Sequence, residues 1–318
     1  MSPLLDVRDV TVEYVGLKGR VKAVDSVSFS LEKGSTLGIV GESGCGKSTL
    51  GFSILRLVPP PGRIVAGEIT LDGVNLLSQS EDAIRRLRGR QVSMIFQDPM
   101  TSLDPLMRIR DHFIELFQTH DQVTTKEEAV SRTTKLLDSL GIGGDRIDDY
   151  PHQFSGGMRQ RVMIGLALAL EPKLVIADEP TTALDVIVEA QVLELLKQLK
   201  EKHSLTLILI THNIGIVAEM TDTIAVMYAG HLVEVGPTTD IFEDPLHPYT
   251  KGLLESAPNV LHPERSMRPI PGIPPDLLNP PSGCRFHPRC AKAFEPCPVR
   301  EPRLVKRDGR LVACHLYD

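Results

Sequence analysis

Several features common in other proteins are missing from this sequence of 318 residues, and each absence excludes a class of protein. Tryptophan is absent and aromatic residues make up only 4%, so the hydrophobic core must be mainly aliphatic. No stretch approaches the roughly 18 consecutive apolar residues of a membrane-spanning helix. The segment MSPLLDVRDVTVEY lacks the basic and apolar regions of a signal peptide. We therefore expect a protein in the cytoplasm or at the surface of a membrane.

Positive charge and cysteine are also scarce. The formal net charge of −6 leaves no basic excess to neutralise phosphates, which argues against a nucleic-acid partner. Only Cys45 lies before residue 284, while Cys284, Cys290, Cys297 and Cys314 gather near the C-terminus. In a reducing cytoplasm such a cluster favours metal ligands over disulfides.

The patterns along the chain predict an α/β fold. Residues 4–40 alternate apolar and polar, as strands and hairpins do. Residues 98–170 have a mainly helical pattern, and the apolar runs KLVIADEP and LTLILITHN flank the helical stretch VEAQVLELLKQLKEKH. This strand–helix–strand order predicts parallel strands that are buried on both faces. From about residue 245 proline becomes dense, which predicts an irregular appended segment.

The stretch GESGCGKS predicts a phosphate-binding loop. It fits G-x-x-x-x-G-K-[ST] and stands between a short apolar strand and a helix. Its glycines let backbone N–H groups turn inward, and the helix directs its positive end to the same place. Lys47 would reach the terminal phosphates of a nucleoside triphosphate. The residues expected to bind this nucleotide are Gly41, Ser43, Gly44, Cys45, Gly46, Lys47, Ser48 and Thr49.

A second group of chemically active residues is expected at the end of the run LVIADEP. Asp178 ends the predicted strand, where a carboxylate suits the Mg²⁺ shell. Glu179 follows, where it can orient or deprotonate an attacking water. Two acids at a strand end are common at protein surfaces, but together with a phosphate loop they indicate nucleotide hydrolysis.

The stretch FSGGMRQRV, residues 154–162, resembles the LSGGQ signature of ABC-type ATPases. Gln97 in MIFQDP, Asp185 in TTALD and His212 in ILITHN stand in the order of that family's other motifs. The resemblance covers about residues 4–245. It implies a nucleotide-binding domain over 1–245, with a P-loop NTPase core, an antiparallel β-subdomain and an α-helical subdomain at about 98–170. A small irregular extension rich in cysteine and proline would follow at 246–318.

The resemblance also implies roles for single residues. Tyr14 would stack on adenine. Gln97 would contact Mg²⁺ and the attacking water, and His212 would contact the γ-phosphate and support Glu179 in catalysis. The implied Mg²⁺ ligands are Ser48, Gln97 and Asp178.

The signature is implied to act in trans. Ser155, Gly156 and Gly157 would bind the γ-phosphate of an ATP held by another ATPase subunit, and Asp185 would lie across the same interface. One chain then supplies two incomplete half-sites, so hydrolysis should need a head-to-tail dimer that ATP closes. The chain departs from the LSGGQ pattern with Phe154 for leucine and Met158 for glutamine, so a glutamine side chain cannot be required there.

Two classes of ABC ATPase are weighed against these features. A non-transport ATPase of translation or DNA repair generally has two cassettes or a long coiled-coil insertion, and this sequence has neither. A transporter ATPase fits better, and it implies two separate membrane-spanning permease subunits. The chain would then be peripheral at the cytoplasmic face of the cell membrane. Segment 97–117 should present the groove where the permease subunits dock.

The stretch DPLHPYTKGLLESAP, residues 244–258, resembles the extension of ATPases from dipeptide, oligopeptide and nickel importers. The resemblance implies import of dipeptides or oligopeptides, a paralogous second ATPase subunit and an extracytoplasmic peptide-binding protein. Nickel or oligosaccharide cargo and a homodimer are the alternatives, because the ATPase does not touch the cargo.

The spacing of the four late cysteines is C-x5-C-x6-C-x16-C. Zinc accepts four thiolates, but its structural sites usually begin with a closer pair of cysteines. An iron–sulfur cluster accepts longer loops, although this spacing is not that of ferredoxins, and inert thiols are a third interpretation. The resemblance to peptide-importer ATPases implies a [4Fe–4S] cluster on Cys284, Cys290, Cys297 and Cys314. We expect a module stapled by this metal site and separate from the ATPase core.

Overall fold

The computed structural model describes residues 2–17, 19–98, 102–120, 125–182, 184–256 and 268–318. The chain divides into two compact units. Met1–Ser78 and Leu209–Asp318 form the first, which we term the phosphate-loop unit, and Gln79–Ile208 form the second, the signature unit. The C-terminal extension therefore groups with the phosphate loop. The predicted domain boundary at residue 245 stays a prediction.

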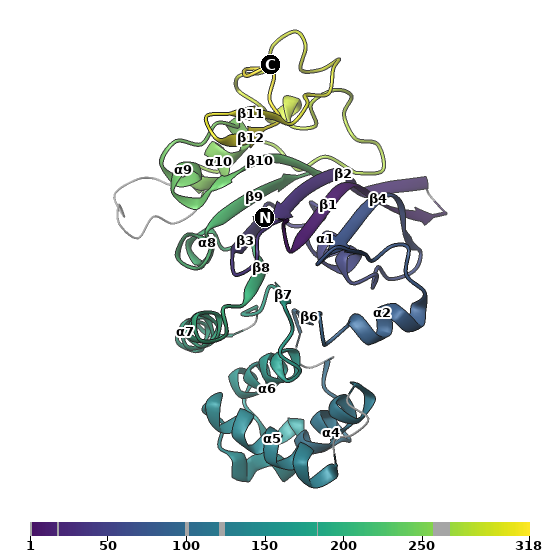
Figure 1. The fold of residues 1–318 in the computed structure, drawn as a ribbon. Coiled ribbons are helices and arrows are strands. Elements are labelled where there is room, and N and C mark those ends of the chain that lie inside the picture. The colour runs from purple at the N-terminus through teal and green to yellow at the C-terminus, as the bar shows by residue number, and fades with distance from the viewer. Residues whose placement is uncertain (1, 18, 99–101, 121–124, 183, 257–267) are drawn as a thin grey trace. The chain divides into compact units, whose positions relative to one another are not determined.

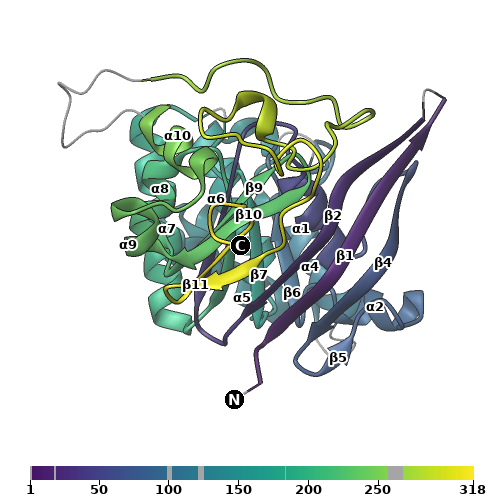
Figure 2. The ribbon, with the colours of Figure 1, turned by 90° about the horizontal axis from the view of Figure 1, so that it is seen from above.

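An antiparallel sheet begins the phosphate-loop unit. Strand β1 (Leu5–Gly16) lies between β2 (Gly19–Leu31) and β4 (Gly62–Leu71), and the short β5 (Val74–Asn75) follows at the edge, as Figure 2 shows. The alternation seen in the sequence has a direct result here, because the buried side chains of β1 are mostly apolar. They are Leu5, Val7, Val10 and Val12, with the polar Thr11 buried among them.

A second sheet carries the phosphate loop. Strand β3 (Thr36–Val40) is buried along its whole length and pairs in parallel with β9 (Thr223–Tyr228), which pairs antiparallel with β10 (His231–Pro237). Helix α1 (Lys47–Ile54) follows β3. Helix α8 (Ile214–Met220) packs against β3. A Cβ at Gly38 would lie 2.3 Å from the Val217 side chain, so this close packing needs glycine.

The C-terminal extension is less irregular than the sequence predicts. Helix α9 (Thr238–Glu243) precedes it, and it contains α10 (Pro248–Ser256), the 3₁₀ turn η3 (His287–Arg289) and the strands β11 (Val305–Arg307) and β12 (Arg310–Val312). Strand β12 pairs with β10 and so continues the core sheet (Figure 1). Three-residue strands carry too little alternation for a sequence pattern to predict them.

The signature unit combines a parallel strand pair with helices. Strand β6 (Val92–Ile95) pairs with β7 (Leu174–Asp178). Its helices are α2 (Glu81–Leu87), α4 (Ile109–His120), α5 (Lys126–Ser139), α6 (Gly156–Leu168) and α7 (Val186–His203), with 3₁₀ turns η1 (Gly144–Asp148) and η2 (Pro151–Gln153). Strand β8 (Thr206–Ile210) spans the division between the units.

Helices α4, α5 and α6 pack on one another and fall within the predicted helical segment 98–170 (Figure 1). Their shared core includes Phe113 and Leu137, both fully buried. The predicted α/β class with an antiparallel β-subdomain is confirmed. No helix in the described part of the chain has the length and apolar character to cross a bilayer.

Candidate nucleotide-binding and catalytic site

The phosphate loop joins β3 to α1, and two of its glycines are required by geometry. Gly41 and Gly46 have positive φ angles of 154° and 106°. A Cβ at Gly41 would lie 2.2 Å from the Met227 carbonyl oxygen, and one at Gly46 would lie 2.0 Å from the Ala23 carbonyl oxygen. Strands β2 and β9 therefore hold the loop so tightly that only glycine fits. This is the rigid backbone that an anion-binding loop needs.

The Lys47 side chain is hydrogen-bonded to the backbone of this loop. Its ammonium donates to the carbonyl oxygens of Gly41, at 2.9 Å, and Glu42, at 3.1 Å, and the residue is only 6% exposed. The Cys45 thiol is buried beside it, and burial raises the thiol's pKa although Lys47 opposes the shift. The thiol is therefore protonated at neutral pH, which agrees with a role for the Cys45 backbone and not its sulfur.

Two further predicted site residues of this unit lie close to the loop. The Tyr14 hydroxyl is 3.4 Å from the Thr49 hydroxyl on α1, so the tyrosine of the β1 strand reaches the helix that follows the loop. His212 is exposed just after β8, where the neighbouring Thr211 N–H donates to the Ile39 carbonyl of β3 at 3.2 Å. Tyr14 thus contacts the helix that follows the phosphate loop, and the residue before His212 contacts the strand that precedes it.

The signature unit brings Gln97 and Glu179 together. The Gln97 amide donates to the Glu179 carboxylate at 2.9 Å, and the Thr182 hydroxyl donates to the same carboxylate oxygen at 3.0 Å. Asp178 ends β7 and is 2% exposed. Glu179 has a φ of 45°, a strained value for a residue with a side chain. A strained, doubly hydrogen-bonded carboxylate has a fixed direction, as a water-orienting group requires.

The signature stretch begins α6, and Ser155 is its N-cap. The Ser155 hydroxyl accepts from the Met158 N–H at 3.3 Å, and Ser155 and Gly156 are exposed. Asp185 caps the neighbouring helix α7 by accepting from the N–H groups of Ile187 and Val188. Ser155 and Asp185, two of the residues proposed to act in trans, therefore also stabilise their own helices, a role that the sequence analysis did not assign to them.

Gly157 has a packing role that the sequence analysis missed as well. A Cβ at this position would lie 2.3 Å from the Val188 side chain of α7. The corresponding atom at Gly156 would meet only Leu184, at an ordinary 3.6 Å. The first turn of α6 thus approaches α7 closely at Gly157 and is open at Gly156.

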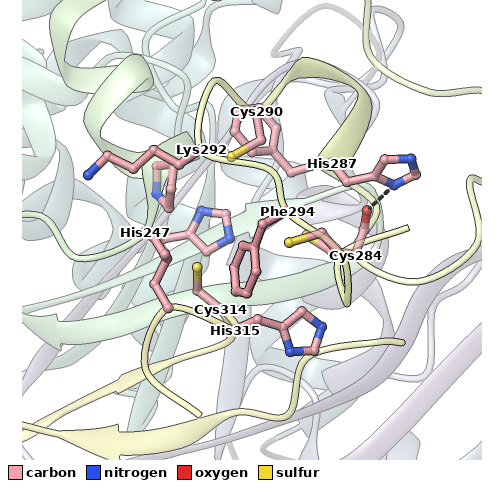
Figure 3. Close-up of a pocket in the computed structure, with 12 residues that line it drawn as sticks. His247, Cys284, His287, Cys290, Lys292, Phe294, Cys314 and His315 are labelled. Atoms are coloured by element: carbon pink, nitrogen blue, oxygen red, sulfur yellow. Dashed lines mark hydrogen bonds between the residues drawn. The ribbon is translucent and has the colours of Figure 1, made fainter. Parts of the chain in front are cut away.

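The four late cysteines line one small pocket of the phosphate-loop unit. Figure 3 shows the sulfurs of Cys284, Cys290 and Cys314 around the rings of Phe294 and His247. Cys297 also lines this pocket, and its carbonyl accepts from the Cys284 N–H at 2.8 Å. All five cysteines lie among the described residues, and there none of them forms a disulfide. Folding therefore brings together thiols that are up to 30 residues apart in the sequence.

Burial controls the protonation of the groups in this pocket. Burial, together with the smaller effect of the neighbouring cysteines, raises the pKa of the Cys284 thiol to about 11. Burial lowers the pKa of His247 to about 3, so this imidazole is neutral at pH 7. In the described part of the chain, no set of three or more His, Cys, Asp or Glu side chains is arranged to hold a single metal ion.

The extension also contacts the phosphate loop directly. The Glu42 N–H donates to the Tyr249 hydroxyl at 2.9 Å, and the Glu42 carboxylate accepts two hydrogen bonds from Arg289. Residues 42–45 line a pocket of about 250 Å³ together with residues 274–277 of the proline-rich segment. The sequence contained no signal for these contacts, because ion pairs between residues more than 200 positions apart have no local pattern.

Comparisons with known proteins agree with this geometry. Residues 24–182 match the family model described as ABC transporter, and residues 233–297 match the model described as the C-terminal region of the oligopeptide/dipeptide transporter. The chain is 48% identical over 310 residues to the oligopeptide transport ATP-binding protein OppD of Bacillus subtilis, covering 96% of this chain and 86% of that protein. It is 42% identical over 320 residues to the dipeptide transport ATP-binding protein DppD of Caldanaerobacter subterraneus, covering 100% and 98%.

A solved structure is similar over the core. It is the dimeric post-hydrolysis state of the ATP-binding cassette MJ0796 bound to ADP and Pi. The TM-score is 0.66 at 26% identity, and the match covers 74% of this chain and 98% of that one.

Proposed function

Because the chain belongs to the ABC transporter ATPase family, and within it to the oligopeptide/dipeptide transporter group, we propose that it powers the import of dipeptides or oligopeptides through separate membrane subunits. The family and the ATPase activity predicted from the motifs are confirmed by these matches. The observation that supports a peptide cargo is the match of residues 233–297 to the C-terminal region of the oligopeptide/dipeptide transporter. Nickel and oligosaccharides are the alternative cargoes.

In the proposed reaction, the phosphate loop binds the triphosphate of ATP through its backbone and Lys47. Ser48, Asp178 and Gln97 would hold Mg²⁺, which neutralises phosphate charge. Oxygen ligands from hydroxyl, carboxylate and amide groups suit this hard cation. The Tyr14 ring would stack on the adenine ring.

Glu179 is the proposed base that orients and deprotonates the attacking water. Its hydrogen bonds from Gln97 and Thr182 direct the carboxylate, and the proton of the water would pass to this group as the bond to the γ-phosphorus forms. His212 would contact the γ-phosphate and position Glu179. The bond between the γ-phosphorus and the β–γ bridging oxygen would break at the same time, its electron pair staying with the oxygen, so that hydrolysis yields ADP and phosphate.

The proposed unit of turnover is a head-to-tail dimer with a second ATPase chain. Ser155, Gly156, Gly157 and Asp185 would complete the ATP site of the partner, which is a paralogous subunit or, as the alternative, a second copy. The exposure of Ser155 and Gly156 supports this, and so do Val186 and Ile187 at the start of α7, which are 79% and 72% exposed. Large apolar residues so exposed commonly mark a protein interface.

Segment 97–117 is the proposed docking site for the two membrane-spanning subunits, and an extracytoplasmic peptide-binding protein would complete the importer. The chain would then lie peripherally at the cytoplasmic face of the cell membrane. Leu106 within the segment is 85% exposed and the adjacent Phe96 is 38% exposed, which offers an apolar anchor for a partner helix. Residues 99–101 of this segment lie outside the described residues.

Uptake measurements test the cargo. Cells lacking the gene should lose uptake of a labelled dipeptide, and the parent chain should restore it while Glu179→Gln should not. Labelled tripeptide, nickel and an oligosaccharide are assayed in parallel. Loss of nickel or oligosaccharide uptake alone would replace the peptide cargo by that alternative.

The four cysteines fit the proposed [4Fe–4S] cluster in their chemistry. Thiolates are the ordinary ligands of such clusters, and all four thiols line one pocket. A single zinc ion needs its sulfurs in a tetrahedron at about 2.3 Å, whereas four iron atoms accept thiolates that stand farther apart. Because burial raises the pKa of Cys284, a bound cluster would displace a proton from this thiol.

Metal analysis separates the two candidate metals. The chain purified without oxygen should carry iron and sulfide and absorb visible light, and Cys284→Ser should lose both properties. Stoichiometric zinc with no iron would assign the site to zinc instead.

A further inference from the structure

Glu42, the second residue of the phosphate loop, is held by two residues of the C-terminal extension. Its N–H donates to the Tyr249 hydroxyl at 2.9 Å. Its two carboxylate oxygens accept from the guanidinium of Arg289 at 2.6 and 3.0 Å. Such a two-pronged pair fixes direction as well as distance. The extension thus controls both the backbone and the side chain of this loop residue.

Arg289 is itself rigidly placed. Its Nε donates to the Pro271 carbonyl at 2.8 Å, its Nη1 lies 3.3 Å from the Tyr228 hydroxyl, and its side chain is 5% exposed. Its backbone lies in the turn between Cys284 and Cys290, where the Arg289 N–H donates to the Phe286 carbonyl. A buried arginine with this many partners cannot follow Glu42 if the loop moves.

Electrostatics explains why the loop needs this partner. A loop that binds a triphosphate carries a carboxylate at Glu42, and an unpaired carboxylate repels a polyanion. Lys47 donates to the carbonyl oxygens of Gly41 and Glu42. A shift of Glu42 would therefore also move the anchor of the lysine expected to contact the phosphates.

The aromatic residues near Arg289 join the core to the extension. Tyr228 of β9, Tyr249 of α10 and Phe286 of the cysteine segment pack with ring centroids 4.5–5.4 Å apart. In a chain with only 4% aromatic residues, this concentration gives a stiff support. Arg289 and the Tyr249 hydroxyl project from this support to Glu42.

We propose that Arg289 is a positioning residue of the ATP site: by pairing with Glu42 it keeps that carboxylate from opposing the phosphates and raises the affinity of the loop for MgATP. This inference rests on the phosphate-binding role of the loop proposed above. The cysteine-rich extension is then a structural part of the nucleotide site. The affinity for ATP depends on whether the extension is folded and holds Arg289 in place. By linkage, MgATP also stabilises the extension.

The test is a set of MgATP affinities measured by calorimetry on the full chain. Arg289→Gln should weaken binding about tenfold, because it leaves the Glu42 carboxylate unpaired. Glu42→Gln should weaken it less, since the charge is removed and an acceptor for Arg289 is kept. The double variant Arg289→Gln/Glu42→Gln should bind more tightly than Arg289→Gln alone, and this rescue is the result that a purely structural role would not produce.

Arg310→Gln is the matched control. Arg310 is a buried arginine of the same extension, and it donates to the Asp240 and Asp244 carbonyls away from the loop. The substitution Arg310→Gln should lower the unfolding temperature and leave the MgATP affinity at the value of the parent chain. Equal affinity losses in Arg289→Gln and Arg310→Gln, or a double variant no better than Arg289→Gln, would overturn the proposal.

Two further variants cover the remaining outcomes. If Arg289→Gln does not fold, Arg289→Lys keeps the charge but not the two-pronged geometry, and binding equal to the parent would then contradict the positioning role. Lys47→Ala separates the two hypotheses, because unchanged MgATP affinity in that variant would remove the proposed phosphate site itself. Unchanged affinity in Arg289→Gln alone would remove only the inference about the extension.

Discussion

The phosphate loop and the signature stretch are both glycine-containing turns that open onto a helix, yet the protein holds them differently. In the phosphate loop, the N-cap residue of α1 is Gly46, which has no side chain to cap the first turn of the helix. In the signature stretch, the Ser155 hydroxyl caps α6. Lys47 of the first is buried, whereas Ser155 of the second is exposed.

This difference matches the two proposed roles. A loop that binds ATP within its own chain gains from being fixed beforehand, and strands β2 and β9 together with Arg289 and Tyr249 fix it. A surface that completes the site of another chain must stay accessible, and its cap keeps the helix end stable while no partner is bound. Preorganisation therefore belongs to the first loop and accessibility to the second.

The largest effect is expected for a substitution that abolishes hydrolysis and leaves both loops intact. Glu179→Gln should lower kcat by roughly 10²–10⁴-fold because it removes the base, and it should leave MgATP affinity near that of the parent. With MgATP the variant should accumulate as a closed dimer, measured by light scattering. The exposed Glu194 of α7 provides the control Glu194→Gln. Hydrolysis at near the parental rate in Glu179→Gln would remove Glu179 from the mechanism.

The next effect distinguishes the two loops directly. Lys47→Ala should weaken MgATP binding by the isolated chain by about 10²-fold, because a buried cationic donor is lost. Ser155→Ala should leave binding by the isolated chain unchanged and lower turnover of the assembled dimer about tenfold. Calorimetry on the chain and phosphate release by the dimer measure the two effects. Weakened binding in isolated Ser155→Ala would contradict action in trans.

The smallest effect concerns packing of the signature helix. Gly157→Ala should lower the free energy of unfolding by about 1–3 kcal/mol, because its Cβ meets Val188 of α7. Gly156→Ala is the neighbouring control and should be neutral or stabilising by up to about 1 kcal/mol, since alanine favours helix and the space is open. Chemical denaturation measures both. Equal destabilisation by the two substitutions would show that Gly157 has no special packing role.

Much of the candidate site could be predicted because each motif is local. The order strand, glycine-rich turn, Lys47 and helix is present within a few residues, and hydrophobic alternation predicted the strands and hairpins of residues 4–40. The bond between Gln97 and Glu179 joins two such motifs, and only the resemblance to a family suggested that they meet. The capping roles of Ser155 and Asp185 could have been found from the N-cap preferences of serine and aspartate.

Other features could not be predicted because they depend on distant parts of the chain. Glu234 is fully buried in β10 and accepts from the N–H groups of Leu246 and His247, which anchors the start of the extension. A charged residue in an alternating strand is normally expected to face solvent. Its burial follows from the backbone of the extension, which supplies the hydrogen bonds.

The sequence by itself determined the reaction class, since the phosphate loop, the acidic pair and the signature each specify their chemistry within a few neighbouring residues. It also determined the α/β class through the period of its apolar residues. Only the tertiary structure decided that the extension supports the phosphate loop. The reason is physical: Arg289 and Glu42 are 247 positions apart, and a pair at that separation exists only when the whole unit has folded around it.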